Sequence, residues 1–389
     1  MEQPEEILKR LIAVPSVNPE DTADPAITGE ARLADLLARE LSARGLQVAL
    51  HEVAPGRPNV MAETTPDRGQ VTVLIEVHLD TVSVAGMRIA PFDPVERDGR
   101  IYGRGACDDK GPMAAALAAL TPERVAALNA AGVRLVVVGA MGEEKGNQGA
   151  KDLVQRNAVR ADQILVLEPT ELAVVHAHKG ILWAAFELHG RAVHGSEPER
   201  GVSAIQAALS FITFLEEQTR RAGEALGHDA LLGAPTVNVG RIEGGAQVNI
   251  VPAHCSLQVD RRLVPGEKAD DLFAEMQAFL GRLVKADQLV GFEARALQQG
   301  DPFATAPDCR LMRDFEAALS ACGLPAQRAG AAWYSDAGPL AAICPEVIVF
   351  GPGSIRQAHT ADEFIEVSSL QTGARVLGEW LDGLARKGF

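Results

Sequence analysis

The chain has 389 residues, of which 47% are hydrophobic and 23% charged, and this length predicts two domains because a single core seldom serves so many residues. Its formal net charge of −15 argues against a nucleic acid as the main partner, since such a surface repels phosphate groups. Five cysteines without paired spacing, no apolar run near the roughly 20 residues that span a bilayer, and no secretory signal predict a cytoplasmic protein that does not bind membranes.

The first part of the chain alternates apolar, β-branched runs with helical patterns, which is typical of an α/β sheet. Leu and Ala recur at helical spacing over residues 28–45, and Gly45 fits the end of that helix. An Ala-rich segment predicts a continuous helix at 110–127. Strands are predicted at 46–53, 58–63, 71–77, 133–140 and 164–170.

The pattern changes near residue 180 and returns to the α/β type near residue 300. The intervening segment predicts a strand at 181–190, a helix at 201–219, strands at 236–244 and 248–262, a helix at 267–284 and a strand at 289–297. After it we expect a helix at 308–321, a strand at 346–350 and an amphipathic helix at 367–386.

This order predicts a discontinuous main domain, residues 1–178 and 297–389, in which helices flank a mixed α/β sheet. Residues 179–296 would form an inserted two-layer α+β domain of the ferredoxin-like type. Because two connections join the domains, we expect a hinge that closes them over a ligand.

Metal-ligating side chains follow three of the apolar strands. His78 and Asp80 follow the first of these strands, Glu143 and Glu144 the second, and Glu168 the third. The carboxyl ends of strands in an open α/β sheet are where ligands and catalytic groups gather. These side chains are therefore expected at one edge of the sheet.

Two further candidates lie in loops: Asp108 in a Gly-rich turn, and His359 after the 346–350 strand. Two imidazoles with several carboxylates and no thiolate suit zinc, and also cobalt or manganese. One bridging carboxylate, with one His and one further carboxylate per ion, would build a two-metal site. Such sites activate water for hydrolysis.

Each of these residues also has a structural explanation. Asp108 and Asp109 could cap the following helix, which is the commoner use of aspartate before a helix. Glu143 and Glu144 could be a solvated loop pair, and His359 an ordinary loop residue. The convergence of so many ligands on one sheet edge favours the metal site.

Five motifs occur in order along the chain: HLDT at 78–81, GRGACDDKG at 103–111, GEE at 142–144, EPT at 168–170 and AHT at 358–360. Together they resemble the di-zinc amidohydrolase and metallopeptidase family of acetylornithine deacetylase, succinyl-diaminopimelate desuccinylase, aminoacylase-1 and glutamate carboxypeptidase. The resemblance covers essentially the whole chain. Among the members it is strongest to acetylornithine deacetylase, through segments such as GRAVHGSEPERGVSAI and FGPGSIRQAHTADEF.

The resemblance implies two divalent metal ions, zinc with cobalt as the other possibility. His78 and Glu168 would bind one ion, Glu144 and His359 the other, and Asp108 would bridge them.

The resemblance also implies that Glu143 is the general base. Asp80 would hold His78 in its ligating tautomer. The peptide bond between Asp108 and Asp109 would be cis.

In the inserted domain, the resemblance implies that His194 polarises the scissile carbonyl in the active site of the partner subunit. This role requires a homodimer. The inserted domain would then serve both as a lid and for dimerisation.

Other positions would bind substrate. Asn249 and Arg262 match positions that bind the substrate's α-carboxylate, although Arg261 is an alternative because it lies next in the strand. Ser335 lies in a segment that lines the pocket in this family. Gly353 belongs to a tight turn that lets backbone amides approach the ligand.

We therefore expect an enzyme that hydrolyses the amide of an N-acyl amino acid, with N-acetylornithine as the leading substrate. A carboxypeptidase, a dipeptidase, an aminoacylase and a succinyl-diaminopimelate desuccinylase remain alternatives, since Trp333 could favour an apolar side chain. An inactive binding protein on the same scaffold is the alternative from another class. A dinucleotide-binding enzyme is disfavoured because the glycines at 103–111 lack the GxGxxG spacing.

Overall fold

The computed structural model describes residues 2–66, 71–227 and 229–387, which fold into two compact units. Unit 1 comprises Met1–His176, Thr305–Ala329 and Ser335–Phe389. Unit 2 comprises Ala177–Ala304 and Gly330–Tyr334. Unit 2 therefore begins two residues before the insertion predicted at 179–296 and ends its first segment eight residues beyond it. Its second segment, at 330–334, is not indicated by the sequence pattern.

A mixed sheet forms the centre of unit 1, which confirms the predicted fold class. In spatial order its strands are β1 (Gln47–Ala54), β2 (Arg57–Glu63), β6 (Val133–Ala140), β3 (Val71–His78), β7 (Gln163–Leu167), β15 (Val347–Phe350), β8 (Val174–His178) and β13 (Phe303–Ala304), with β14 (Arg328–Ala331) beside β8. β6, β3, β7 and β15 run parallel to one another, whereas β2 is antiparallel to β6. The parallel strands are buried on nearly every residue, as expected where both faces of a sheet are covered.

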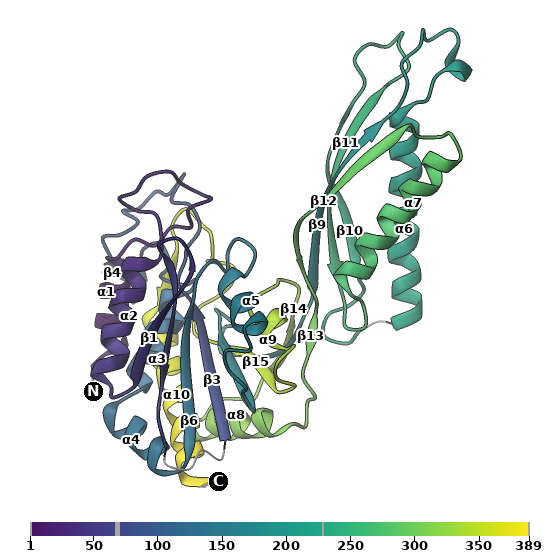
Figure 1. Ribbon diagram of the computed structural model, residues 1–389. Helices are drawn as coiled ribbons and strands as arrows, with labels where there is room; N and C mark the ends of the chain where they lie inside the picture. The colour runs from purple at the N-terminus through teal and green to yellow at the C-terminus, as the bar shows by residue number, and fades with distance from the viewer. Residues whose placement is uncertain (1, 67–70, 228, 388–389) are drawn as a thin grey trace. The chain divides into compact units, whose positions relative to one another are not determined.

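The helices of unit 1 are α1 (Pro4–Ile12), α2 (Ala31–Ala43), α3 (Lys110–Ala119), α4 (Pro122–Ala130), α5 (Gln148–Gln155), α8 (Arg310–Ala321), α9 (Ala337–Leu340) and α10 (Val367–Lys387). α2 packs on β1 and β2, while α10 packs against α3, α4 and α8 (Figure 1). The core there includes Trp380, whose ring lies 5.4 Å from that of Phe315.

The helix predicted at 110–127 is wrong, because the chain breaks it into α3 and α4. Thr121 adopts an extended conformation before Pro122, and its side chain accepts a hydrogen bond from the amide of Arg124. A residue before proline avoids the helical conformation, and threonine is a good cap, so both signals end one helix and begin the next.

The sequence analysis did not anticipate several elements of unit 1, among them the first helix and a small second sheet. The N-terminal helix α1 carries proline at its start, acids in its first turn and basic residues in its last turn, so ordinary end signals predict it. A three-stranded sheet also forms from β4 (Val95–Arg97), β5 (Arg100–Tyr102) and β16 (Phe364–Glu366). The Asp98–Gly99 turn that joins β4 to β5 is a typical hairpin signal.

Unit 2 is a four-stranded antiparallel sheet with two long helices, as the two-layer prediction requires. Its elements are β9 (Gly180–His189), the short helix η1 (Pro198–Arg200), α6 (Ala204–Leu226), β10 (Thr236–Gly244), β11 (His254–Leu263), α7 (Ala269–Lys285) and β12 (Gly291–Gly300). The strand order is β10-β11-β9-β12, and both helices cover one face of this sheet (Figure 1). Phe186 and Phe211 pack edge to face in its core.

The strand predicted at 248–262 begins later than expected, at His254. Residues 245–253 form a loop instead, and proline at 252 removes one backbone donor from any ladder there. Asn249 therefore lies in a loop and not in the sheet. In the described part of the chain, no helix is long and apolar enough to cross a membrane.

Candidate metal centre and active site

The parallel strands of unit 1 bring the predicted ligands to one edge of the sheet. β3 ends at His78, which is in register with Ala140 at the end of β6. β7 ends one residue before Glu168, and β15 leads into the loop that carries His359. Because these strands run in the same direction, their carboxyl ends share one edge.

The five candidate ligands form two overlapping groups. His78, Asp108 and Glu168 make one group, and Asp108, Glu144 and His359 make the other. Within each group the ligand atoms lie within 4.8 Å of one another. Asp108 is the residue that belongs to both groups.

Each oxygen of Asp108 faces a different imidazole. Oδ1 lies 2.9 Å from Nε2 of His78, and Oδ2 lies 3.3 Å from Nε2 of His359. Nε2 of His359 is also 3.1 Å from Oε1 of Glu144. This is the arrangement that a carboxylate bridging two ions needs.

The electrostatics of the cluster favour a bound cation. Burial raises the pKa of Glu168 well above its ordinary value, and the charge of Asp108 adds to the rise. Burial likewise raises the pKa of Glu144, although a hydrogen bond from His359 opposes it. Burial also acts against ionisation of Asp108, but hydrogen bonds from His359 and His78 hold its pKa below its ordinary value. Hydrogen bonds to Asp108 and Glu144 raise the pKa of His359 to about 10.

The donor set fits two divalent ions of intermediate hardness. It supplies two imidazoles and three carboxylates, with no thiolate among the five residues. Four of the five have side chains that are at least nine-tenths buried, and a divalent cation would offset the repulsion among their charges.

Asp80 makes more contacts than the sequence predicts. Its backbone oxygen lies 2.9 Å from Nδ1 of His78, whereas its carboxylate is 3.7 Å from the same nitrogen. The carboxylate accepts hydrogen bonds from the amides of Glu143 and Glu144 and from the side chain of Asn18, at 3.0, 3.2 and 2.7 Å. Asp80 thus holds His78 and also fixes the turn that carries both glutamates.

Glu363 holds the turn before Asp108, and sequence reasoning missed it. Its Oε1 accepts hydrogen bonds from the amides of Cys107 and Asp108, at 2.9 and 3.1 Å. Its Oε2 accepts from the amide of Gly105 and from the buried guanidinium of Arg104. The bond between Asp108 and Asp109 is cis, as the resemblance implies, and Asp109 does not cap α3 with its side chain.

Glu143 lies beside a second group of buried polar residues that was not predicted. Nδ2 of Asn147 donates to Oε1 of Glu143 and to Oδ1 of Asp336, at 3.1 and 3.0 Å. Asp336 also interacts with the buried carboxyl group of Glu76 on β3. Burial, together with the charge of Asp336, raises the pKa of Glu76 well above its ordinary value, which favours one shared proton between the two.

Ser335 and Gly353 already have partners within the chain. The hydroxyl of Ser335 is buried and accepts a hydrogen bond from the amide of Ala337, which begins α9. The amide of Gly353 donates to the hydroxyl of Ser369, and its φ of 92° suits glycine. A side chain at Gly353 would also meet Sγ of Cys107 at 2.7 Å.

In unit 2, the exposed His194 has a defined tautomer. Its Nδ1 lies 3.2 Å from the amide of Ser196 and 2.7 Å from the hydroxyl of the same residue. An amide N–H can only donate, so Nδ1 accepts and the neutral ring carries its proton on Nε2. Nε2–H makes no hydrogen bond to any residue that the structure describes, so it can donate to a carbonyl oxygen.

The two neighbouring arginines of β11 differ in accessibility. Arg261 is fully buried and pairs with Glu267, whereas the side chain of Arg262 is 26% exposed and lies 2.9 Å from Asp260. Of the two, Arg262 is therefore the one that a ligand can reach. The difference in exposure favours Arg262 over Arg261, and the binding role of Arg262 stays a prediction.

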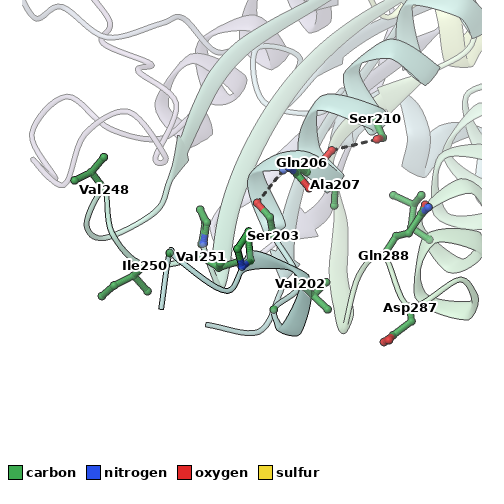
Figure 2. A pocket seen from close by; sticks show the side chains of 15 residues that line it. Val202, Ser203, Gln206, Ala207, Ser210, Val248, Ile250, Val251, Asp287 and Gln288 are labelled. Carbon is green, nitrogen blue, oxygen red and sulfur yellow. Dashed lines mark hydrogen bonds between the residues drawn. The ribbon is translucent and has the colours of Figure 1, made fainter. Parts of the chain in front are cut away.

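A groove of about 490 Å³ lies beside the loop that carries Asn249 (Figure 2). Val248, Ile250 and Val251 line one side of it, and Gln206 and Ser210 of α6 line another. Gly195, next to His194, also belongs to the lining. The groove contains none of the five candidate metal ligands.

The chain is similar to known proteins over most of its length. The family model "Peptidase family M20/M25/M40" matches residues 74–382. Acetylornithine deacetylase of Proteus mirabilis is 32% identical over 384 residues, which cover 97% of this chain and 95% of the relative. Acetylornithine deacetylase of Myxococcus xanthus is 33% identical over 78% of this chain and 77% of its own length.

Solved structures share the fold at lower identity. A tripeptidase from Staphylococcus aureus superimposes with a TM-score of 0.78 at 22% identity, covering 99% of this chain and 98% of its own. A dinuclear metal-binding peptidase from Bacillus subtilis gives 0.70 at 14% identity, covering 99% and 98%.

Proposed function

Because the chain belongs to peptidase family M20/M25/M40, and is therefore a metal-dependent amidohydrolase, we propose that it removes the acyl group from an N-acyl amino acid. N-Acetylornithine is the first candidate, since relatives named acetylornithine deacetylase align over nearly the whole chain. The observation that carries the proposal is the pair of overlapping ligand groups that share Asp108.

In this proposal His78 and Glu168 hold one divalent ion, and Glu144 and His359 hold the other, with Asp108 between them. When bound, the ions acidify a water molecule and polarise the scissile carbonyl. Zinc is the proposed metal and cobalt the alternative, in keeping with the imidazole and carboxylate donors.

Glu143 acts as the general base. Its carboxylate takes a proton from the attacking water and later delivers it to the leaving amine. Burial raises the pKa of Glu143 well above its ordinary value, although the positive charge of His78 opposes the rise. A raised pKa suits a carboxylate that must accept a proton near neutral pH.

Residues of unit 2 complete the proposed mechanism. Nε2–H of His194 donates to the carbonyl oxygen as negative charge develops there. Arg262 and Asn249 bind the substrate's α-carboxylate, for which a planar guanidinium is well shaped. His194 acts on the active site of a partner subunit, which makes the proposed enzyme a homodimer, and cytoplasmic location is part of the same proposal.

A hydrolysis screen tests this function. Chelator-treated protein is assayed with and without zinc or cobalt against N-acetylornithine, N-succinyl-diaminopimelate, other N-acyl amino acids and dipeptides. We expect no hydrolysis without metal and the highest kcat/KM for N-acetylornithine with metal. A preference for dipeptides would replace the proposed substrate, and full activity without metal would remove the mechanism.

A further inference from the structure

We propose that Asn147 is a positioning residue that orients the carboxylate of Glu143. Asp336 accepts a second hydrogen bond from the amide of Asn147 and so anchors Asn147. This inference rests on the proposed role of Glu143 as general base. It concerns three residues that the fold brings together from distant parts of the chain, since Asn147 and Asp336 are separated by 189 positions.

The two N–H groups of the Asn147 amide are both used, each on a different carboxylate. Nδ2 donates to Oε1 of Glu143 at 3.1 Å and to Oδ1 of Asp336 at 3.0 Å. The amide oxygen of Asn147 is buried and has no hydrogen-bond partner in the described part of the chain. The orientation of the side chain is therefore set by the two hydrogen bonds that its N–H groups donate. The flipped amide would point its oxygen at two carboxylate oxygens, which is unfavourable.

The backbone of Asn147 supports the same function. Its φ of 56° and ψ of 41° are left-handed, a conformation in which asparagine is enriched among residues other than glycine. The backbone N–H of Asn147 donates to the backbone oxygen of Glu143 at 3.2 Å. The main chain and the side chain of Asn147 therefore both hydrogen-bond Glu143. Only 1% of Asn147 is exposed, so its side-chain amide is shielded from competing water.

A neutral donor is the chemically suitable choice at this position. A lysine or arginine would pair with Glu143 and weaken it as a base, whereas an amide fixes the orientation without adding charge. With Oε1 held, Oε2 is the oxygen left to take the proton, since it makes no hydrogen bond within the described residues. Asp336 is 1% exposed and keeps the amide from rotating away.

The test uses two substitutions of Asn147 and one matched control. Glycine accepts the left-handed backbone, so Asn147→Gly removes the donor without straining the chain. Asn147→Asp keeps the shape but replaces the donor by a third carboxylate. Asn157 has a φ of 49° and is exposed, so Asn157→Gly reports the effect of the same change outside the site.

We expect Asn147→Gly to lower kcat roughly tenfold to a hundredfold, a part of what a well-placed general base supplies. Asn147→Asp should lower kcat further. KM, bound metal per chain and melting temperature should stay near those of the wild type, and Asn157→Gly should change nothing. A purely structural role would instead lower the melting temperature or the metal content together with kcat.

Two further comparisons show whether Asn147 acts through Glu143. In a Glu143→Ala background, Asn147→Gly should have no additional effect on the residual rate. Asp336→Asn keeps an oxygen acceptor for the amide and should retain more activity than Asp336→Ala.

Contrary results separate the inference from the proposed function. If Glu143→Ala is inactive while both Asn147 variants keep the wild-type kcat, the positioning role is wrong and the base remains. If the double variant loses kcat by the product of the two single-variant losses, Asn147 acts independently of Glu143 and the positioning role is again wrong. Wild-type activity in Glu143→Ala would overturn both.

Discussion

The candidate active-site residues of the two units differ in burial and in the hydrogen bonds that fix their side chains. In unit 1, His78, Asp80 and Asp108 are almost fully buried and joined to one another or to nearby backbone by hydrogen bonds. In unit 2, His194 and Asn249 are exposed on loops, and the contacts of the His194 ring are to a residue two positions away. These three side chains of unit 1 are thus held in place before any ligand binds.

This difference suggests a division of roles. Preorganised donors and acceptors stabilise a transition state without reorganising at the moment of reaction, which suits metal chemistry and proton transfer. The electrostatic interactions of exposed residues become strong only when a substrate or a second chain removes water from around them. Substitutions in unit 1 should therefore affect kcat or metal binding, and those in unit 2 should depend on the substrate or the partner.

The largest effect is expected for Glu143→Ala. The variant should bind metal like the wild type and lose about 10²- to 10⁴-fold in kcat, because only the general base is removed. Steady-state rates together with metal analysis check this. A rate near that of the wild type would show that another group takes the proton.

His194→Ala comes next, with a loss of about 10²- to 10³-fold in kcat, the usual cost of removing one oxyanion donor. Mixing this variant with Glu143→Ala, then letting subunits exchange, should restore part of the activity. Restoration requires that the intact His194 of one chain serve the intact Glu143 of another. If the mixture stays as inactive as its components, His194 does not act across an interface.

Glu363→Gln tests how far the buried contacts of unit 1 control the metal. Loss of the carboxylate leaves Arg104 buried without its counter-charge, and unfolding free energy should fall by about 3–5 kcal/mol. Metal affinity should fall by about 10- to 100-fold, because glutamine keeps only one of the two oxygens that accept from Arg104 and from the amides of the Asp108 turn. Denaturant unfolding and calorimetric metal titration measure both effects, and unchanged metal affinity would restrict Glu363 to stability.

The smallest effect on turnover is expected for Arg262→Ala. It should raise KM by about tenfold for substrates with an α-carboxylate, because one charge-assisted hydrogen bond is lost. Arg261→Ala is the matched comparison. It should lower the melting temperature instead, since its partner Glu267 is left unpaired in the interior. Exchanged outcomes would reverse the assignment of the two arginines.

The parts of the site that depend on strand ends could be predicted from the sequence. The apolar runs before His78, Glu143 and Glu168 identify buried strands, and parallel strands deliver their carboxyl ends to one edge. The division of ligands between two ions came from the family resemblance. Geometry alone then shows Asp108 shared by both groups.

Contacts between distant parts of the chain could not be read in this way. Asn147 looks like an ordinary loop residue, and nothing in its neighbourhood points to Asp336. Glu363 accepts a hydrogen bond from the amide of Asp108, which lies 255 positions earlier in the chain. Such hydrogen bonds are set by tertiary packing, whereas the break at Thr121 carried a local signal in the following proline.

The most direct test of the two-ion centre is a calorimetric zinc titration of chelator-treated protein. The wild type should bind two ions per chain, and His78→Ala and His359→Ala should each lose one. Asp108→Ala should lose tight binding at both positions, because the same carboxylate serves both groups. Two ions bound tightly by Asp108→Ala, or a single ion bound by the wild type, would contradict a shared aspartate.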